Sequence, residues 1–174
     1  VYFNAMDILA AAGLTEKDIN PQYLNFDQSA DGLKDGKIDA AFIVAGAPTP
    51  AITELCMTNA KTRIVPIDGA IADKLMKDNT FYSVYKIPAG TYANQAAEVL
   101  TVTVKATLIV SASATEDDVY KITKAIFDNI ADITKEHAKG AELSLENATQ
   151  GLTVPFHAGA AKYFKEKNIE VAVK

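Results

Sequence analysis

The chain has 174 residues, of which 49% are hydrophobic and 22% charged, and its formal net charge is -5. This composition is typical of a globular protein with one domain or two small lobes, and it excludes wholesale disorder. Acidic and basic residues are interspersed and no apolar stretch is long enough to cross a bilayer, so neither nucleic acid nor membrane insertion is expected.

Helices and strands are predicted to alternate through the first half of the chain. Apolar residues recur at helical spacing from Tyr2 to Ala10, and Gly13 follows as a stop signal, so the first element is a helix. The pattern then predicts a strand at 21–24, a helix capped by Asp27 and stopped by Gly36, a buried strand at 40–45, a helix from Pro50 to near Ala60, a strand at 63–67 and a helix capped by Asp68. This alternation favours an α/β sheet with helices on its faces.

The second half begins with strands and ends with helices. Strands are predicted at 81–87 and 101–107, and the apolar run at 108–110 is expected to enter a core. Thr115 and Asp118 resemble a capping box that opens the clearest helix of the chain, with an apolar stripe from Val119 to Ile133. A short helix capped by Ser144, a loop at 155–159 and a last helix at 160–167 complete the prediction.

The single cysteine and the two histidines carry little chemistry. Because Cys56 is the only cysteine, an internal disulfide framework and a cysteine-based metal cluster are excluded. Its helical spacing from Ile52 and Leu55 favours a buried inert thiol over a nucleophile. His137 and His157 lie beside small or turn residues, which favours surface or capping roles. We therefore expect no metal and no cofactor.

A candidate anion site lies where the predicted strand at 40–45 meets the next helix. Gly46 allows close approach of the backbone to a ligand, Thr49 can cap, and Pro50 suits the first helical position. The free N–H groups of a helix start bind anions, so this junction predicts an anion site. An ordinary turn between a strand and a helix is the alternative, and geometry alone favours it.

Six phrases in the sequence carry a resemblance to a known family. They are AAGLT at 11–15, LKDGKIDAAF at 33–42, GAPT at 46–49, IPAGTY at 87–92, SLENA at 144–148 and VPFHAGAAKYF at 154–164. In this order they resemble the C-terminal part of the solute receptors of TAXI-type TRAP transporters, and they are spread along nearly the whole chain, from residue 11 to residue 164.

The resemblance implies an α/β fold of the periplasmic binding protein type II-like kind, in which two α/β lobes close on a small ligand. Residues 1–98 are expected to form the second lobe with a truncated start, and residues 99–174 the crossover strand and the helices that return to the first lobe. The family's signal peptide and Gly-rich first-lobe loop do not occur in this sequence. The chain is therefore expected to be a C-terminal fragment, with self-association as one way to cover the surface of the missing lobe.

The resemblance also favours function at the junction described above, because GAPT matches the family's loop at the ligand cleft. Thr91 and Tyr92 match a second loop near the expected hinge. Tyr92 either closes over the ligand or donates its hydroxyl to it; the alternative is a surface aromatic in a turn. The implied ligand-binding residues are Gly46, Ala47, Pro48, Thr49, Thr91, Tyr92 and Asn4.

The implied function is that of a periplasmic solute-binding subunit. It captures a small carboxylate or amino acid, such as glutamate or 2-oxoglutarate, and delivers it to a membrane-embedded TRAP transporter subunit. No enzyme is expected, because no nucleophile pairs with a base at a predicted strand end. The alternatives are a ligand-sensing regulatory domain or an enzyme on the same α/β lobe, since fold does not fix function, and a surface used only for docking.

Overall fold

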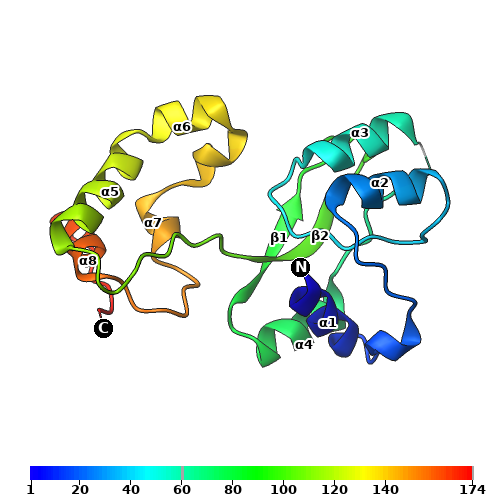
Figure 1. Cartoon of the computed structure of the whole chain (residues 1–174), viewed down its shortest axis with the longest axis horizontal. Helices are drawn as coiled ribbons and strands as arrows, with labels where there is room; N and C mark the ends of the chain where they lie inside the picture. Colours follow the sequence, from blue (N-terminus) through cyan, green and yellow to red (C-terminus); the bar gives the residue numbers. More distant parts are fainter. Residues whose placement is uncertain (60, 174) are drawn as a thin grey trace. The chain divides into compact units, whose positions relative to one another are not determined.

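The computed structural model describes residues 1–59 and 61–173. The chain divides into two compact units, Val1–Val104 and Lys105–Lys174 (Figure 1). We call them the first and the second unit.

The first unit combines helices with a two-stranded antiparallel sheet. Its strands pair in a register that runs from Tyr82 opposite Val104 to Ile87 opposite Val99. Helix α4 packs against both α1 and β1, and α2 packs against α3. The elements are α1 (Tyr2–Ala11), the 3-10 helix η1 (Glu16–Asp18), α2 (Phe26–Lys34), α3 (Pro50–Thr58), α4 (Gly69–Asp78), β1 (Tyr82–Ile87) and β2 (Val99–Val104).

The core of the first unit lies where α3, β1 and the loop between the two strands meet. Cys56, Ile87 and Tyr92 are buried there, and partly buried side chains that include Ala47 and Ile52 pack against them. Leu75 of α4 is the most deeply buried large side chain among the described residues, with 1% of its surface exposed. Burial of each such side chain contributes about 1.5–3 kcal/mol before the entropy cost of ordering it.

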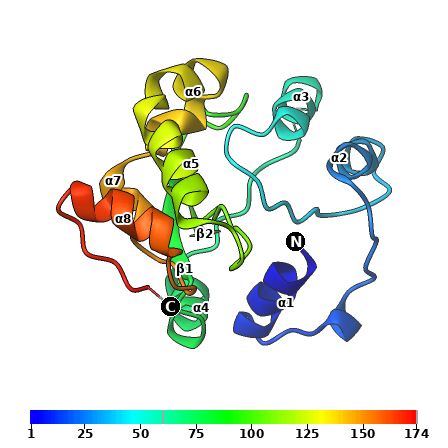
Figure 2. The ribbon, with the colours of Figure 1, turned by 60° about the vertical axis from the view of Figure 1, so that its left-hand side comes forward.

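The second unit is helical. Helices α5 and α8 pack side by side, and α6 packs against η2 (Figure 2). An aromatic cluster joins the first pair, because the ring of Phe127 stacks on Tyr163 at 5.5 Å between centroids and meets the edge of Phe164. The elements are α5 (Glu116–Asp128), α6 (Ile130–Glu136), the 3-10 helix η2 (Ala138–Glu142), α7 (Leu145–Ala148) and α8 (Ala158–Glu166).

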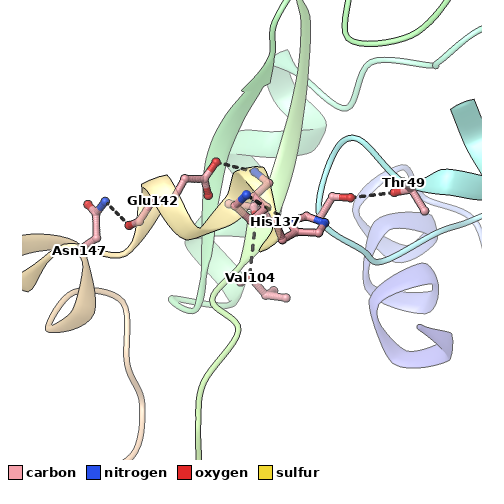
Figure 3. Close-up of polar contacts among 8 residues, drawn as sticks. Thr49, Val104, His137, Glu142 and Asn147 are labelled. Carbon is pink, nitrogen blue, oxygen red and sulfur yellow. Dashed lines mark hydrogen bonds and ion pairs between the residues drawn. The ribbon is translucent and has the colours of Figure 1, made fainter. Parts of the chain in front are cut away.

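Side-chain caps begin several of these helices. Thr115 Oγ1 accepts the Asp118 N–H at 3.1 Å and donates to the Asp118 carboxylate, which confirms the predicted cap of α5. Ser144 Oγ accepts the Asn147 N–H at 3.0 Å, as predicted for α7. Asn147 in turn donates through Nδ2 to the carbonyl oxygen of Glu142 at 3.0 Å, which ties α7 to the end of η2 (Figure 3).

The mixed α/β class is confirmed, but several predicted strands are wrong. Residues 21–24, 40–45 and 63–67 are irregular, and only β1 and β2 form a sheet among the described residues. A strand needs a ladder of hydrogen bonds to a neighbour, and the single bond found here runs from Ile67 N–H to the carbonyl oxygen of Leu100 in β2. The apolar composition of these segments does not by itself provide neighbouring strands for them to pair with.

Other predicted boundaries and burial also need correction. The cap of α2 is Asn25 rather than Asp27: Asn25 Oδ1 accepts the Gln28 backbone N–H, and the Asn25 backbone N–H donates to Gln28 Oε1. Helix α3 ends at Thr58, and the predicted end near Ala60 lies outside the described residues. Strand β2 stops at Val104, so Leu108 and Ile109 have no sheet to enter and are 69% and 77% exposed.

Two further predicted elements differ in extent. The apolar stripe from Val119 to Ile133 is divided between α5 and α6, which meet at Asn129. Helix α8 begins at Ala158, because the His157 ring accepts the Gly159 N–H and caps it within the predicted loop. No helix in the described part of the chain is both long and apolar enough to span a membrane.

We predict that Gly159→Ala destabilises the second unit. A Cβ atom at this position would lie 2.7 Å from the Tyr120 backbone nitrogen and would also meet the Glu116 carbonyl oxygen, and neither backbone atom moves without shifting α5. Overpacking of this kind costs about 1–3 kcal/mol of unfolding free energy. Urea unfolding followed by circular dichroism measures the loss.

Gly32→Ala in α2 is the matched control. Its nearest neighbour is the flexible side chain of Ile38, at 3.2 Å, which can move aside. Alanine also favours a helix over glycine by up to about 1 kcal/mol, so we expect little net change. Equal stability losses in the two variants would contradict the close contact between α5 and α8.

Candidate functional site

The structure brings together two segments that the sequence singles out, although they lie 43 residues apart. The backbone N–H of Thr49 donates a hydrogen bond to the Tyr92 hydroxyl oxygen at 3.0 Å. Both residues are buried, with 6% of Thr49 and 4% of Tyr92 exposed. Tyr92 is therefore not a surface aromatic in a turn, and its hydroxyl joins the loop before α3 to the loop after β1.

The loop before α3 is held by its own hydrogen bonds. The Thr49 hydroxyl donates to the carbonyl oxygen of Gly46 at 2.8 Å (Figure 3). Thr49 is the N-cap residue of α3, but its side chain accepts no hydrogen bond from the helix. The peptide bond between Ala47 and Pro48 is cis, and Ala47 packs against the core. The Thr49 side chain thus fixes the shape of this loop instead of capping the helix.

The first turn of α3 retains donors for a ligand. Pro50 has no N–H, and the Thr53 N–H bonds to the carbonyl oxygen of Thr49. Within residues 1–59 and 61–173, the N–H groups of Ala51 and Ile52 find no acceptor. Two amide donors at the positive end of a helix of nine residues can hold an anion such as a carboxylate.

The second loop, after β1, is organised by Gln95. Its side-chain amide donates to the carbonyl oxygens of Ile87, Pro88 and Ala97, and its Oε1 accepts the Tyr92 N–H at 3.3 Å. The Thr91 hydroxyl donates to the carbonyl oxygen of Pro88 at 2.7 Å. Gln95 thereby holds the backbone from which Tyr92 projects.

Sequence reasoning missed Gln95 and its neighbour Asn94. Asn94 has a φ of 65° and donates through Nδ2 to the carbonyl oxygen of Cys56 at 3.2 Å. Asparagine tolerates this left-handed conformation better than most residues, so Asn-Gln directly after a predicted loop was an available signal for a built turn. This bond links the second loop to α3 itself.

Asn4 lies in a different hydrogen-bond network. Its Nδ2 donates to the Tyr82 hydroxyl at 2.8 Å, and that hydroxyl donates to the Asp7 carboxylate at 2.9 Å. Burial raises the pKa of Tyr82, and its hydrogen bond to Asp7 acts in the same direction. The structure therefore joins Thr49 and Tyr92 directly, but uses Asn4 to attach α1 to the start of β1.

The residues with nucleophilic or metal-binding chemistry have structural roles. His157 and His137 each accept a backbone N–H through Nδ1, which confirms the predicted capping role. Cys56 is 3% exposed, and burial raises the pKa of its thiol. In the part of the chain that the structure describes, no three His, Cys, Asp or Glu side chains are placed to hold a metal ion.

A mixed α/β chain with a small two-stranded sheet is consistent with the periplasmic binding protein type of fold. The chain belongs to the NMT1-like family, which its sequence matches over residues 2–167. This is a periplasmic-binding-protein-like family, whose members are typically binding proteins and usually extracytoplasmic. Membership of this family indicates a role in solute binding.

We predict that Tyr92→Phe lowers stability by removing the acceptor of the buried Thr49 N–H. Leaving a buried donor without a partner costs about 1–3 kcal/mol. Amide hydrogen exchange at Thr49 should accelerate in the variant, while thermal unfolding shows the loss of stability. Tyr120→Phe is the control, because it removes an exposed hydrogen bond to Glu166 and should change stability little. Unchanged exchange at Thr49 would contradict the bond.

We also predict that Cys56 reacts slowly with a thiol reagent such as DTNB at pH 8. Burial excludes the reagent, and the raised pKa leaves less reactive thiolate than an ordinary cysteine has at this pH. Labelling should become fast and complete in denaturant. Because Cys56 is the only cysteine, the signal has a single source. Rapid labelling of the folded protein would show that the core around Ile87 and Tyr92 does not cover the thiol.

Proposed function

We propose that this protein is the extracytoplasmic solute receptor of a TAXI-type TRAP transporter. It captures a small carboxylate or amino acid, such as glutamate or 2-oxoglutarate, and hands it to the membrane-embedded transporter subunit. The proposal rests on the NMT1-like family, on the six family phrases in the sequence and on the geometry at the start of α3.

The observation that carries the ligand assignment is the hydrogen bond between Thr49 and Tyr92. The Tyr92 hydroxyl accepts the Thr49 N–H, so its own proton remains to donate to a ligand. The nearest helical amides, those of Ala51 and Ile52, have no acceptor among the described residues. A ligand oxygen at this helix start can therefore accept hydrogen bonds from neutral donors, namely the Tyr92 hydroxyl and the Ala51 and Ile52 amides.

This arrangement suits a carboxylate better than a cation. Every group offered is a hydrogen-bond donor at the positive end of a helix, and such an end stabilises negative charge. The protein as a whole is acidic, with a net charge of -5, so long-range attraction does not bring an anion to the site. Affinity must come from local donors and from the shape of the two loops.

We predict that one small carboxylate among glutamate, glutamine, 2-oxoglutarate and C4 dicarboxylates raises the melting temperature. A ligand at one hundred times its Kd stabilises the folded state by about 2.7 kcal/mol. Isothermal titration then gives the Kd for that ligand. Thr49→Ala releases the carbonyl oxygen of Gly46 and Tyr92→Phe removes the hydroxyl donor, so each should weaken binding by about tenfold or more.

Thr58→Ala is the matched control for the binding experiment. Its hydroxyl bonds to the carbonyl oxygen of Glu54 at the other end of α3, away from the helix start. Binding by this variant should equal that of the unmodified protein. Equally strong binding by all three variants would show that the ligand does not bind at the start of α3. If none of the carboxylates binds, this ligand class is contradicted.

A further inference from the structure

A second polar feature of the first unit takes no part in the site at α3. The side chains of Tyr2, Phe3, Glu16 and Tyr23 come together from α1, η1 and the segment that follows, and we call them the aromatic–carboxylate cluster. Tyr2 and Tyr23 lie 6.3 Å apart between ring centroids, and Phe3 meets Tyr2 edge-on at 5.5 Å. Phe3 is 80% exposed and Tyr23 75%.

The two tyrosines hold the carboxylate from both sides. The Tyr23 hydroxyl donates to Glu16 Oε1 at 2.7 Å, and the Tyr2 hydroxyl donates to Oε2 at 2.9 Å. These two hydrogen bonds, that of Tyr23 first, lower the pKa of the Glu16 carboxyl. Glu16 is therefore negatively charged at neutral pH, and its position between the rings is fixed.

The cluster has no positive partner within the described residues. No lysine or arginine there forms an ion pair with Glu16, and no cation lies over the rings of Tyr2, Phe3 or Tyr23. The second unit shows the contrast, because Lys162 lies 5.1 Å from the Tyr120 ring and Lys167 lies 5.4 Å from the Tyr163 ring. Aromatic faces beside a carboxylate attract a cation by two independent electrostatic terms.

The fold does not require all of these side chains. The hydroxyls of Tyr2 and Tyr23 attach the chain around residues 16–23 to α1, which is a structural role. The Phe3 side chain forms no hydrogen bond in that attachment, and most of its apolar surface faces solvent. An exposed phenylalanine beside two tyrosines is the composition of a contact surface, because aromatic residues are enriched at interfaces.

We propose that the aromatic–carboxylate cluster docks an arginine side chain presented by a protein partner. The planar guanidinium stacks on the tyrosine and phenylalanine rings while its N–H groups reach the free lone pairs of the Glu16 carboxylate. Small-molecule sites are concave and bury most of their ligand, whereas Phe3 and Tyr23 are open to solvent, so a protruding side chain of a macromolecule fits better. This proposal stands apart from carboxylate binding at α3.

The test is a titration of the isotope-labelled protein with a short capped peptide that carries arginine, followed by amide chemical shifts. We expect saturable shifts at Tyr2, Phe3, Glu16 and Tyr23 that weaken with added salt. The same peptide with citrulline in place of arginine is neutral but nearly isosteric, and it should bind at least fivefold more weakly. Equal shifts with both peptides, or no saturable shift with arginine, would overturn the proposal.

Paired variants separate recognition from folding. Phe3→Ala and Glu16→Gln should each reduce arginine-peptide affinity severalfold, with the rest of the spectrum unchanged. Met57→Ala removes a similarly exposed apolar side chain, and Asp73→Asn removes an exposed carboxylate of α4. Neither control should change affinity. Peptide binding that survives both Phe3→Ala and Glu16→Gln would place the contact elsewhere and overturn the proposal.

Discussion

The first unit depends on one buried hydrogen bond, between the Thr49 N–H and the Tyr92 hydroxyl. The loop before α3 lies outside the sheet, and the loop after β1 is held by the strand ladder only at its two ends. Tyr92 supplies both parts of the connection, because its ring packs with Cys56 and Ile87 while its oxygen satisfies a buried donor. A hydrophobic core alone would leave that donor unpaired, at a cost comparable to a large part of a domain's stability.

That constraint explains how an irregular region provides an ordered site. The two-stranded sheet is small, and the extended segments around it lack ladders, so the loops before α3 and after β1 are held by side chains. Gln95 bonds three carbonyl oxygens in one loop, Thr49 bonds Gly46 in the other, and Asn94 links the second loop to α3. Each side chain satisfies backbone groups that a larger sheet would otherwise have paired.

Local signals were readable from the sequence, and non-local pairings were not. The caps at Thr115 and Ser144 and the strand β1 depend on neighbouring residues, and all were predicted. The strand at 40–45 and the burial of 108–110 depend on partners far along the chain, and both predictions were wrong. An apolar run indicates that a segment tends to be buried, but it does not identify the residues that bury it.

The candidate site shows the same division. Resemblance to a family identified the loops that contain Thr49 and Tyr92, but the hydrogen bond between these two residues is seen only in the three-dimensional structure. The same resemblance grouped Asn4 with them, whereas its side chain bonds Tyr82. The role of Gln95 was not predicted, because a glutamine that donates to three carbonyl oxygens has no fixed spacing from them in the sequence.

The chemistry of the site limits how it can select a ligand. The single arginine of the chain, Arg63, is exposed and makes no ion pair with a described residue, and the donors at α3 are neutral amides and a hydroxyl. Neutral donors distinguish carboxylates weakly by charge, because they offer no fixed positive group to match a second negative one. For the carboxylates proposed as ligands, selection would therefore have to come from the shape of the loops and from groups that face the far end of the ligand.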